Sequence, residues 1–120
     1  MAVFAFALGL KIIKVSSKNI GVTDVALNIA DEKVYELIEN VLSEVVDLFP
    51  GKIIHIGGDE VKFDSWKNRQ DVNQIMAKNN LKNFSDLQIY FNNRIARFLQ
   101  TKGYRMMGWN EILGNVHEDK

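Results

Sequence analysis

The feature that most constrains the fold is a short apolar run between two turn signals. Residues 52–56 read Lys-Ile-Ile-His-Ile, with Pro50-Gly51 before them and Gly57-Gly58 after them. β-Branched residues favour strands, and a short, mostly apolar run between turn signals is typical of a strand covered on both faces, as in a parallel sheet. The sequence therefore predicts a buried strand at residues 52–56.

A helical pattern precedes this strand. From Asp31 onward, apolar residues recur at the spacing of one buried helix face. Asp31 can cap the first turn, Glu32 suits the positive end of the helix dipole, and Pro50-Gly51 ends the helix. The predicted buried stripe comprises Val34, Leu37, Ile38, Val41, Leu42, Val45 and Leu48.

A second helical pattern follows a polar loop at residues 62–70 and a short helix around residues 72–78. Ser85 and Gln88 have the spacing of a capping box, and Gly103 is placed to end the helix. Its predicted stripe is Leu87, Phe91, Ile95, Phe98 and Leu99.

A second strand is predicted at residues 104–109. The order of elements is then helix, strand, helix, strand, and the default connection between the strands is a right-handed crossover. We therefore expect an α/β fold with parallel strands.

Composition excludes several classes of function. The 120 residues are 47% hydrophobic and 25% charged, which is ordinary for a globular domain and enough for one core. Lys+Arg and Asp+Glu are 15 each, and there is no long basic run, so neither nucleic-acid binding nor a polybasic membrane anchor is indicated. Cysteine is absent, which excludes disulfides and thiolate metal sites.

The first ten residues carry no charge, and Lys11 is the first charged residue. A secretory signal places its positive charge before the apolar stretch, and this run is too short to span a bilayer. We interpret residues 1–10 as a buried segment, with a degraded signal as the alternative.

Candidate functional residues follow both predicted strands. The first strand contains His55 and leads into Asp59 and Glu60, and the second leads into Trp109 and Glu111. Ligands of open α/β sheets and of (β/α)8 barrels lie at the C-terminal ends of the strands. Two groups of polar residues at one edge of a sheet therefore indicate a candidate site.

Asp59 and Glu60 form the most informative pair. Gly57-Gly58 can supply the turn that brings both carboxylates to one pocket. Two close carboxylates do not easily both ionise, and a protonated Glu beside an ionised Asp suits acid-assisted glycoside cleavage. The alternative is a solvated turn.

Each aromatic candidate also has two interpretations. Trp109 is either ordinary packing or a flat wall for a sugar, and Trp66 either stacks on a sugar or folds back onto the protein. His55 suits a core position, and His117 lies in a polar C-terminal stretch. There is no paired-histidine pattern for a catalytic metal and no phosphate-binding or serine-hydrolase motif.

Residues 53–61, Ile-Ile-His-Ile-Gly-Gly-Asp-Glu-Val, resemble the signature of the β-N-acetylhexosaminidases of glycoside hydrolase family twenty. Three further segments are similar to that family in the same order. They are an upstream stretch at residues 21–28 and 33–37, Leu48-Phe49-Pro50, and Gly108-Trp109-Asn110-Glu111-Ile112. The similarity covers residues 21–113 and, more weakly, residues 1–20.

The resemblance implies a (β/α)8 barrel, of which residues 1–120 form a part that includes the fourth and fifth strands. It implies that Glu60 is the general acid, that Asp59 orients the 2-acetamido group of the substrate, and that Trp109 lines the acetamido pocket. His55 and Glu111 are further candidates for binding the substrate. A glycan or chitooligosaccharide with a terminal N-acetylhexosamine is the implied substrate, with no metal or organic cofactor.

A (β/α)8 barrel needs about 250 residues, so the family's other sugar-binding residues have no counterpart here. We therefore expect the isolated chain to hydrolyse N-acetylhexosaminides poorly or not at all. The alternatives to a catalytic fragment are a non-catalytic sugar-binding module from the same barrel, or a small α/β protein whose motif is a coincidence.

Overall fold

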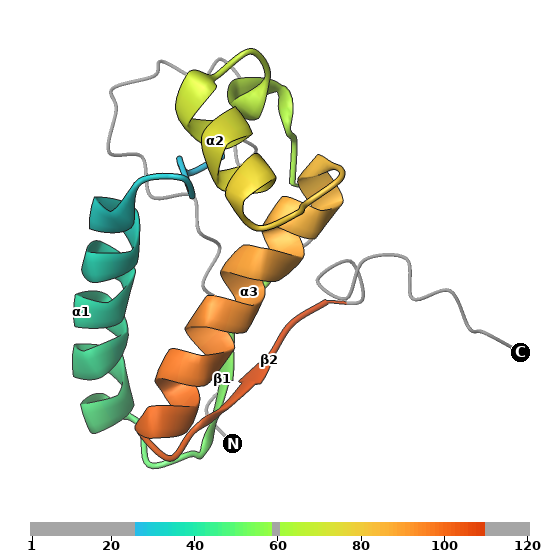
Figure 1. Ribbon diagram of the computed structural model, residues 1–120. Coiled ribbons are helices and arrows are strands. Elements are labelled where there is room, and N and C mark those ends of the chain that lie inside the picture. The colour runs from blue at the N-terminus through green and yellow to red at the C-terminus, as the bar shows by residue number, and fades with distance from the viewer. Residues whose placement is uncertain (1–25, 59–60, 110–120) are drawn as a thin grey trace, which may run out of the picture.

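The elements follow one another in the order that the sequence predicts. The computed structural model of the chain describes residues 26–58 and 61–109 (Figure 1). In chain order the elements are α1 (Glu32–Leu48), β1 (Ile53–His55), a 3-10 turn η1 (Asp64–Trp66), α2 (Gln70–Lys78), α3 (Phe84–Thr101) and β2 (Arg105–Met107). The predicted segment at residues 1–10 lies outside the described residues.

Strands β1 and β2 pair in parallel, with Ile54 opposite Met106 and His55 opposite Met107. The connection between them contains η1, α2 and, last and longest, α3. The α/β fold with parallel strands is therefore confirmed. None of the helices in residues 26–58 and 61–109 is both long and apolar enough to cross a membrane.

Helix α1 begins as predicted, because the Asp31 side chain accepts a hydrogen bond from the backbone N–H of Lys33 at 3.0 Å. Its C-terminal end is held by Tyr104, whose hydroxyl lies 2.7 Å from the carbonyl oxygen of Val46 and 3.0 Å from that of Phe49. Carbonyl groups near a helix end have few intrahelical partners. Tyr104, which leads into β2, thus provides a hydrogen-bond donor for carbonyl groups at the end of α1.

The predicted stripe of α1 is wrong at one end. The buried residues are Tyr35, Ile38, Leu42, Val45 and Val46, whereas Leu48 is 75% exposed. The buried face includes Tyr35, because its ring packs inside while its hydroxyl donates to the carbonyl oxygen of Ile29 at 2.7 Å. This face runs along Tyr35, Leu42 and Val46, which leaves Leu48 on the solvent side.

The predicted capping box of α3 is also wrong. The helix begins one residue before Ser85, and Asn83 is its cap: the Asn83 side chain accepts from the backbone N–H of Asp86 at 2.8 Å. Gln88 is buried on the inner face of the helix. Gly103 follows the end of α3 with a φ of 78°, as its predicted role requires.

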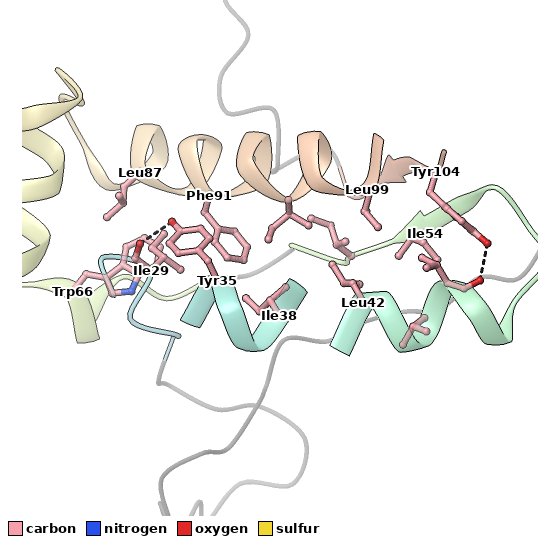
Figure 2. Close-up of a cluster of buried hydrophobic side chains, with 14 of the residues drawn as sticks. Ile29, Tyr35, Ile38, Leu42, Ile54, Trp66, Leu87, Phe91, Leu99 and Tyr104 are labelled. Carbon is pink, nitrogen blue, oxygen red and sulfur yellow. Dashed lines mark hydrogen bonds between the residues drawn. The ribbon is translucent and has the colours of Figure 1, made fainter. Parts of the chain in front are cut away.

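The core lies between the two long helices and β1, as Figure 2 shows. Tyr35 of α1 contacts Phe91 of α3 with ring centroids 5.7 Å apart, and Ile54 of β1 is almost completely buried. Within the strands, Ile54 and the partly buried Met106 pack in this core. Alternation along a strand then places His55 and Met107 on the opposite face of the sheet.

A surface ion pair joins the two long helices beside this core. Both amino groups of Arg94 donate to the Glu32 carboxylate, at 2.7 and 2.9 Å, and the guanidinium lies 3.6 Å from the centre of the Tyr35 ring. These hydrogen bonds lower the pKa of Glu32, while burial raises the pKa of Tyr35. The pair lies at an exposed carboxylate, so its contribution to stability is small beside that of the core.

Two leucines test this description of the core. In the natural protein that contains this sequence, Leu99→Ala should lower the free energy of unfolding by about 2–5 kcal/mol, because Leu99 is 0% exposed and its loss leaves a cavity. The matched control Leu48→Ala should change it by less than about 0.5 kcal/mol. Chemical denaturation measures both, and an equal cost at the two positions would contradict the orientation of α1.

Candidate active site

The segments that follow β1 and β2 stay hydrogen-bonded to each other. Beyond the paired strands, the backbone N–H of Ile56 donates to the carbonyl of Met107 at 2.8 Å, and that of Trp109 donates to the carbonyl of Gly57 at 3.0 Å. The parallel ladder therefore continues past both strand ends. It brings Trp109 beside the turn that leads into the Asp59-Glu60 pair.

That turn depends on its glycines. Gly57 and Gly58 have φ angles of 72° and 90°, which residues with a Cβ rarely adopt. Two side chains contact the turn: the Gly57 N–H donates to His55 Nδ1 at 3.0 Å, and Gln88 Nε2 donates to the Gly58 carbonyl at 3.0 Å. The predicted glycine turn is present, and its backbone is bonded to both β1 and α3.

His55 and Trp109 lie against each other. Their ring centroids are 5.1 Å apart with the planes at 67°, an edge-on contact. His55 is buried, and because Nδ1 accepts from Gly57, the neutral imidazole carries its proton on Nε2. Trp109 is 54% exposed, so it presents an open aromatic surface backed by a buried histidine.

The remaining predicted site residues, Asp59, Glu60 and Glu111, lie outside the described residues. Asp59 follows Gly58 directly in the sequence, and Glu111 comes two positions after Trp109. The structure thus brings together His55, Trp109 and the turn before the acidic pair.

Trp66 is part of the core. It is 3% exposed, its Nε1 donates to the Leu27 carbonyl at 2.8 Å, and its ring stacks on Phe63 with centroids 5.2 Å apart. Phe84 contacts it edge-on. The interpretation of Trp66 as a sugar-stacking residue is therefore wrong: Trp66 folds back and anchors the loop between β1 and α2.

Gln88 is the residue of this region that sequence reasoning missed. Its polar side chain occupies a position on the buried face of α3, between Leu87 and Phe91. A glutamine within an apolar stripe is itself a signal, because a buried amide needs hydrogen-bond partners. Its spacing from Ser85 also fits a capping box, and that interpretation hides the signal.

A shallow hollow elsewhere in the structure is lined by Arg69, Gln70, Asp71 and Gln74. Its charges already pair with one another: Arg69 donates to both Asp71 oxygens at 3.0 and 2.8 Å, and Asn28 donates to the same carboxylate at 2.8 Å. These hydrogen bonds lower the pKa of Asp71. We regard this cluster as a surface network that ties the entry of α1 to α2. In the described part of the chain, no three acidic or histidine side chains converge to form a metal site.

Comparison with known proteins decides the family. The family model described as glycosyl hydrolase family 20, catalytic domain, matches residues 9–120. The chain belongs to this family. The match includes both strands, the glycine turn and every candidate site residue.

Individual relatives agree with this assignment. The chain is 43% identical over 82 residues to a beta-hexosaminidase of Porphyromonas gingivalis and 36% identical over 86 residues to one of Vibrio furnissii. These alignments cover 68% and 72% of this chain but only 11% and 14% of the relatives. The chain therefore spans a small part of the length of the curated proteins that it matches.

Solved structures of the family have the same local fold. The structure of a chitobiase from Flavobacterium johnsoniae superposes with a TM-score of 0.74 at 36% identity, and it aligns with 78% of this chain and 14% of its own. An exo-β-N-acetylglucosaminidase from Vibrio harveyi, solved in complex with N-acetylglucosamine, gives a TM-score of 0.70 at 32% identity. That alignment covers 76% of this chain and 14% of the enzyme.

The two tryptophans should differ in chemical reactivity. Limited oxidation of the native protein with N-bromosuccinimide, followed by peptide mapping with mass spectrometry, should modify the exposed Trp109 first. Trp66 should stay protected until the protein unfolds, because it is buried and hydrogen-bonded. Equal oxidation of both residues in the folded protein would contradict the placement of Trp109 as an open surface.

Proposed function

We propose that the protein containing this chain is a β-N-acetylhexosaminidase that releases terminal, non-reducing N-acetylglucosamine or N-acetylgalactosamine from glycans or chitooligosaccharides. Membership of family 20 supports the reaction class. The observation that carries the proposal is the bond between the Trp109 N–H and the Gly57 carbonyl, since it joins a half-exposed aromatic surface to the turn before Asp59-Glu60.

Residues 1–120 are, in this proposal, one part of a (β/α)8 barrel. Strands β1 and β2 are its fourth and fifth strands, and the remaining strands come from the rest of the protein. Two observations support this: the strands are parallel, and both long helices cover one face of the sheet, as helices surround a barrel (Figure 1). His55, Trp109 and the turn lie at the C-terminal ends of the strands, where barrel enzymes bind substrates.

Glu60 and Asp59 are the proposed catalytic residues. Glu60 protonates the glycosidic oxygen as the bond from that oxygen to the anomeric carbon breaks. The carbonyl oxygen of the substrate's own 2-acetamido group attacks the anomeric carbon and forms an oxazolinium ion, whose positive charge Asp59 stabilises. Glu60, now ionised, removes a proton from the water that opens this ion, and the configuration at the anomeric carbon is retained.

Trp109, His55 and Glu111 are the proposed substrate-binding residues. A sugar presents apolar C–H groups on one face, and the open ring of Trp109 is a flat apolar surface of matching character. His55 contributes by holding the Trp109 ring edge-on. Glu111 follows closely in the same segment and offers a carboxylate to sugar hydroxyls.

Removing the proposed acid tests the mechanism. In the natural protein, Glu60→Gln should lower kcat on N,N′-diacetylchitobiose by about 10²–10⁴-fold, because an amide cannot deliver the proton that the leaving group needs. The control Glu36→Gln makes the same change at an exposed position of α1 and should leave kcat unchanged. If Glu60→Gln retains full kcat, another residue is the acid.

The 120-residue chain alone should show no more than background hydrolysis of N,N′-diacetylchitobiose, because it lacks most of a barrel. The natural protein, assayed in parallel, should be active. Turnover by the short chain that disappears in Glu60→Gln would show that this part suffices. If the natural protein binds N-acetylglucosamine without turnover, and Asp59→Asn weakens that binding, it is a sugar-binding module instead.

A further inference from the structure

Gln88 is a polar side chain on an otherwise apolar helix face. It is 8% exposed and lies on the face of α3 that also buries Leu87, Phe91 and Ile95. Burying an amide without hydrogen bonds costs free energy, and an apolar side chain here would simply extend the core. A specific polar contact therefore accounts better for glutamine at this position than packing does.

That contact is with the glycine turn. Gln88 Nε2 donates to the carbonyl oxygen of Gly58 at 3.0 Å, across 30 positions of sequence. From β1, His55 Nδ1 accepts from the N–H of Gly57 at 3.0 Å. Two consecutive residues of the turn are thus hydrogen-bonded to side chains, Gly58 to one from α3 and Gly57 to one from β1.

The Gly58 carbonyl is the group whose orientation matters most for the residues that follow. It belongs to the peptide group that joins Gly58 to Asp59, and a peptide group is planar. Gly58 has a φ of 90° and no Cβ. Because glycine has more backbone freedom than other residues, the conformation of Gly58 alone does little to fix the orientation of this peptide group. A hydrogen bond to the carbonyl oxygen supplies the missing restriction.

We propose that Gln88 is a positioning residue, which fixes the peptide plane at Gly58 and so directs the chain into Asp59 and Glu60. The inference rests on the proposed function, because it assigns Gln88 a role in aligning the acid of that reaction. Gln88 touches neither substrate nor reacting atoms in this role. Its effect on the reaction passes through the backbone of the turn.

A comparison of two leaving groups separates this role from a merely structural one. The natural protein and its Gln88→Met variant are assayed on N,N′-diacetylchitobiose, whose leaving group needs a proton, and on 4-nitrophenyl N-acetyl-β-glucosaminide, whose leaving group departs readily without one. Methionine keeps the length of the side chain but cannot donate. Gln100→Met is the matched control, at an exposed position of the same helix.

A misaligned acid should lower kcat/KM on the disaccharide by roughly tenfold or more, because small displacements of a catalytic group are costly. The loss on the aryl substrate should be several-fold smaller, and Gln100→Met should affect neither. Equal losses on both substrates, as a smaller folded fraction would give, or no loss on either, would overturn the assignment of Gln88. A natural protein that hydrolyses neither substrate would overturn the proposed function itself, and the inference with it.

Gln88→Glu provides a second test that tolerates some loss of stability. A protonated carboxyl can donate to the Gly58 carbonyl as the amide does, whereas a carboxylate cannot, and burial raises the pKa of such a carboxyl. The kcat/KM of this variant relative to the natural protein should therefore rise as the pH falls. His55 and the acidic pair are present in both proteins, so the ratio isolates the contribution of position 88. A ratio that does not change with pH would overturn the proposal.

Discussion

The parallel pairing of β1 with β2 is the constraint on which the rest of the structure depends. Its register sets Ile54 opposite Met106 in the core and His55 opposite Met107 on the other face. The same ladder continues to the bond between the Trp109 N–H and the Gly57 carbonyl, so the relative placement of the two candidate site segments is set by backbone hydrogen bonds. A shift of one residue would move every side chain of one strand to the opposite face and would separate His55 from the ring of Trp109.

Two buried tyrosines connect this pairing to the helices. Tyr104 stands at the entry of β2, and its hydroxyl reaches the last carbonyl groups of α1, while Tyr35 near the start of α1 packs on Phe91 of α3. Each tyrosine buries a large apolar ring and gives its hydroxyl a backbone partner, which avoids the cost of an unpaired polar group. These contacts fix α1 near both of its ends, against β2 and against α3. The same packing places Gln88 of α3 beside the turn.

Sequence patterns predicted the elements and their order because apolar periodicity and turn residues are local signals. The strand at Ile53–His55, the cap at Asp31 and the stop at Gly103 all follow from a few neighbouring residues. The errors have a different origin. Leu48 satisfies the helical spacing but faces solvent, and Trp66 sits in a polar loop yet packs on Phe63, because tertiary contacts decide both. The roles of Asp59, Glu60 and Glu111 remain predictions, which depend on residues from other strands that a local pattern does not contain.

The alternation of side chains along the strands also determines which residues lie on the face of the sheet opposite the helices. Alternation places Met107 there, and Met107 and Trp109 are both among the exposed large apolar residues of the described chain. A protein rarely leaves such surface open unless another part of the molecule or a ligand covers it. In a barrel this face points inward, so neighbouring strands would cover Met107, while Trp109 lies past the strand end, where the interior opens. In the proposed barrel, the alternation that fills the interior would thus leave the Trp109 ring at its mouth, beside the turn that His55 and Gln88 contact.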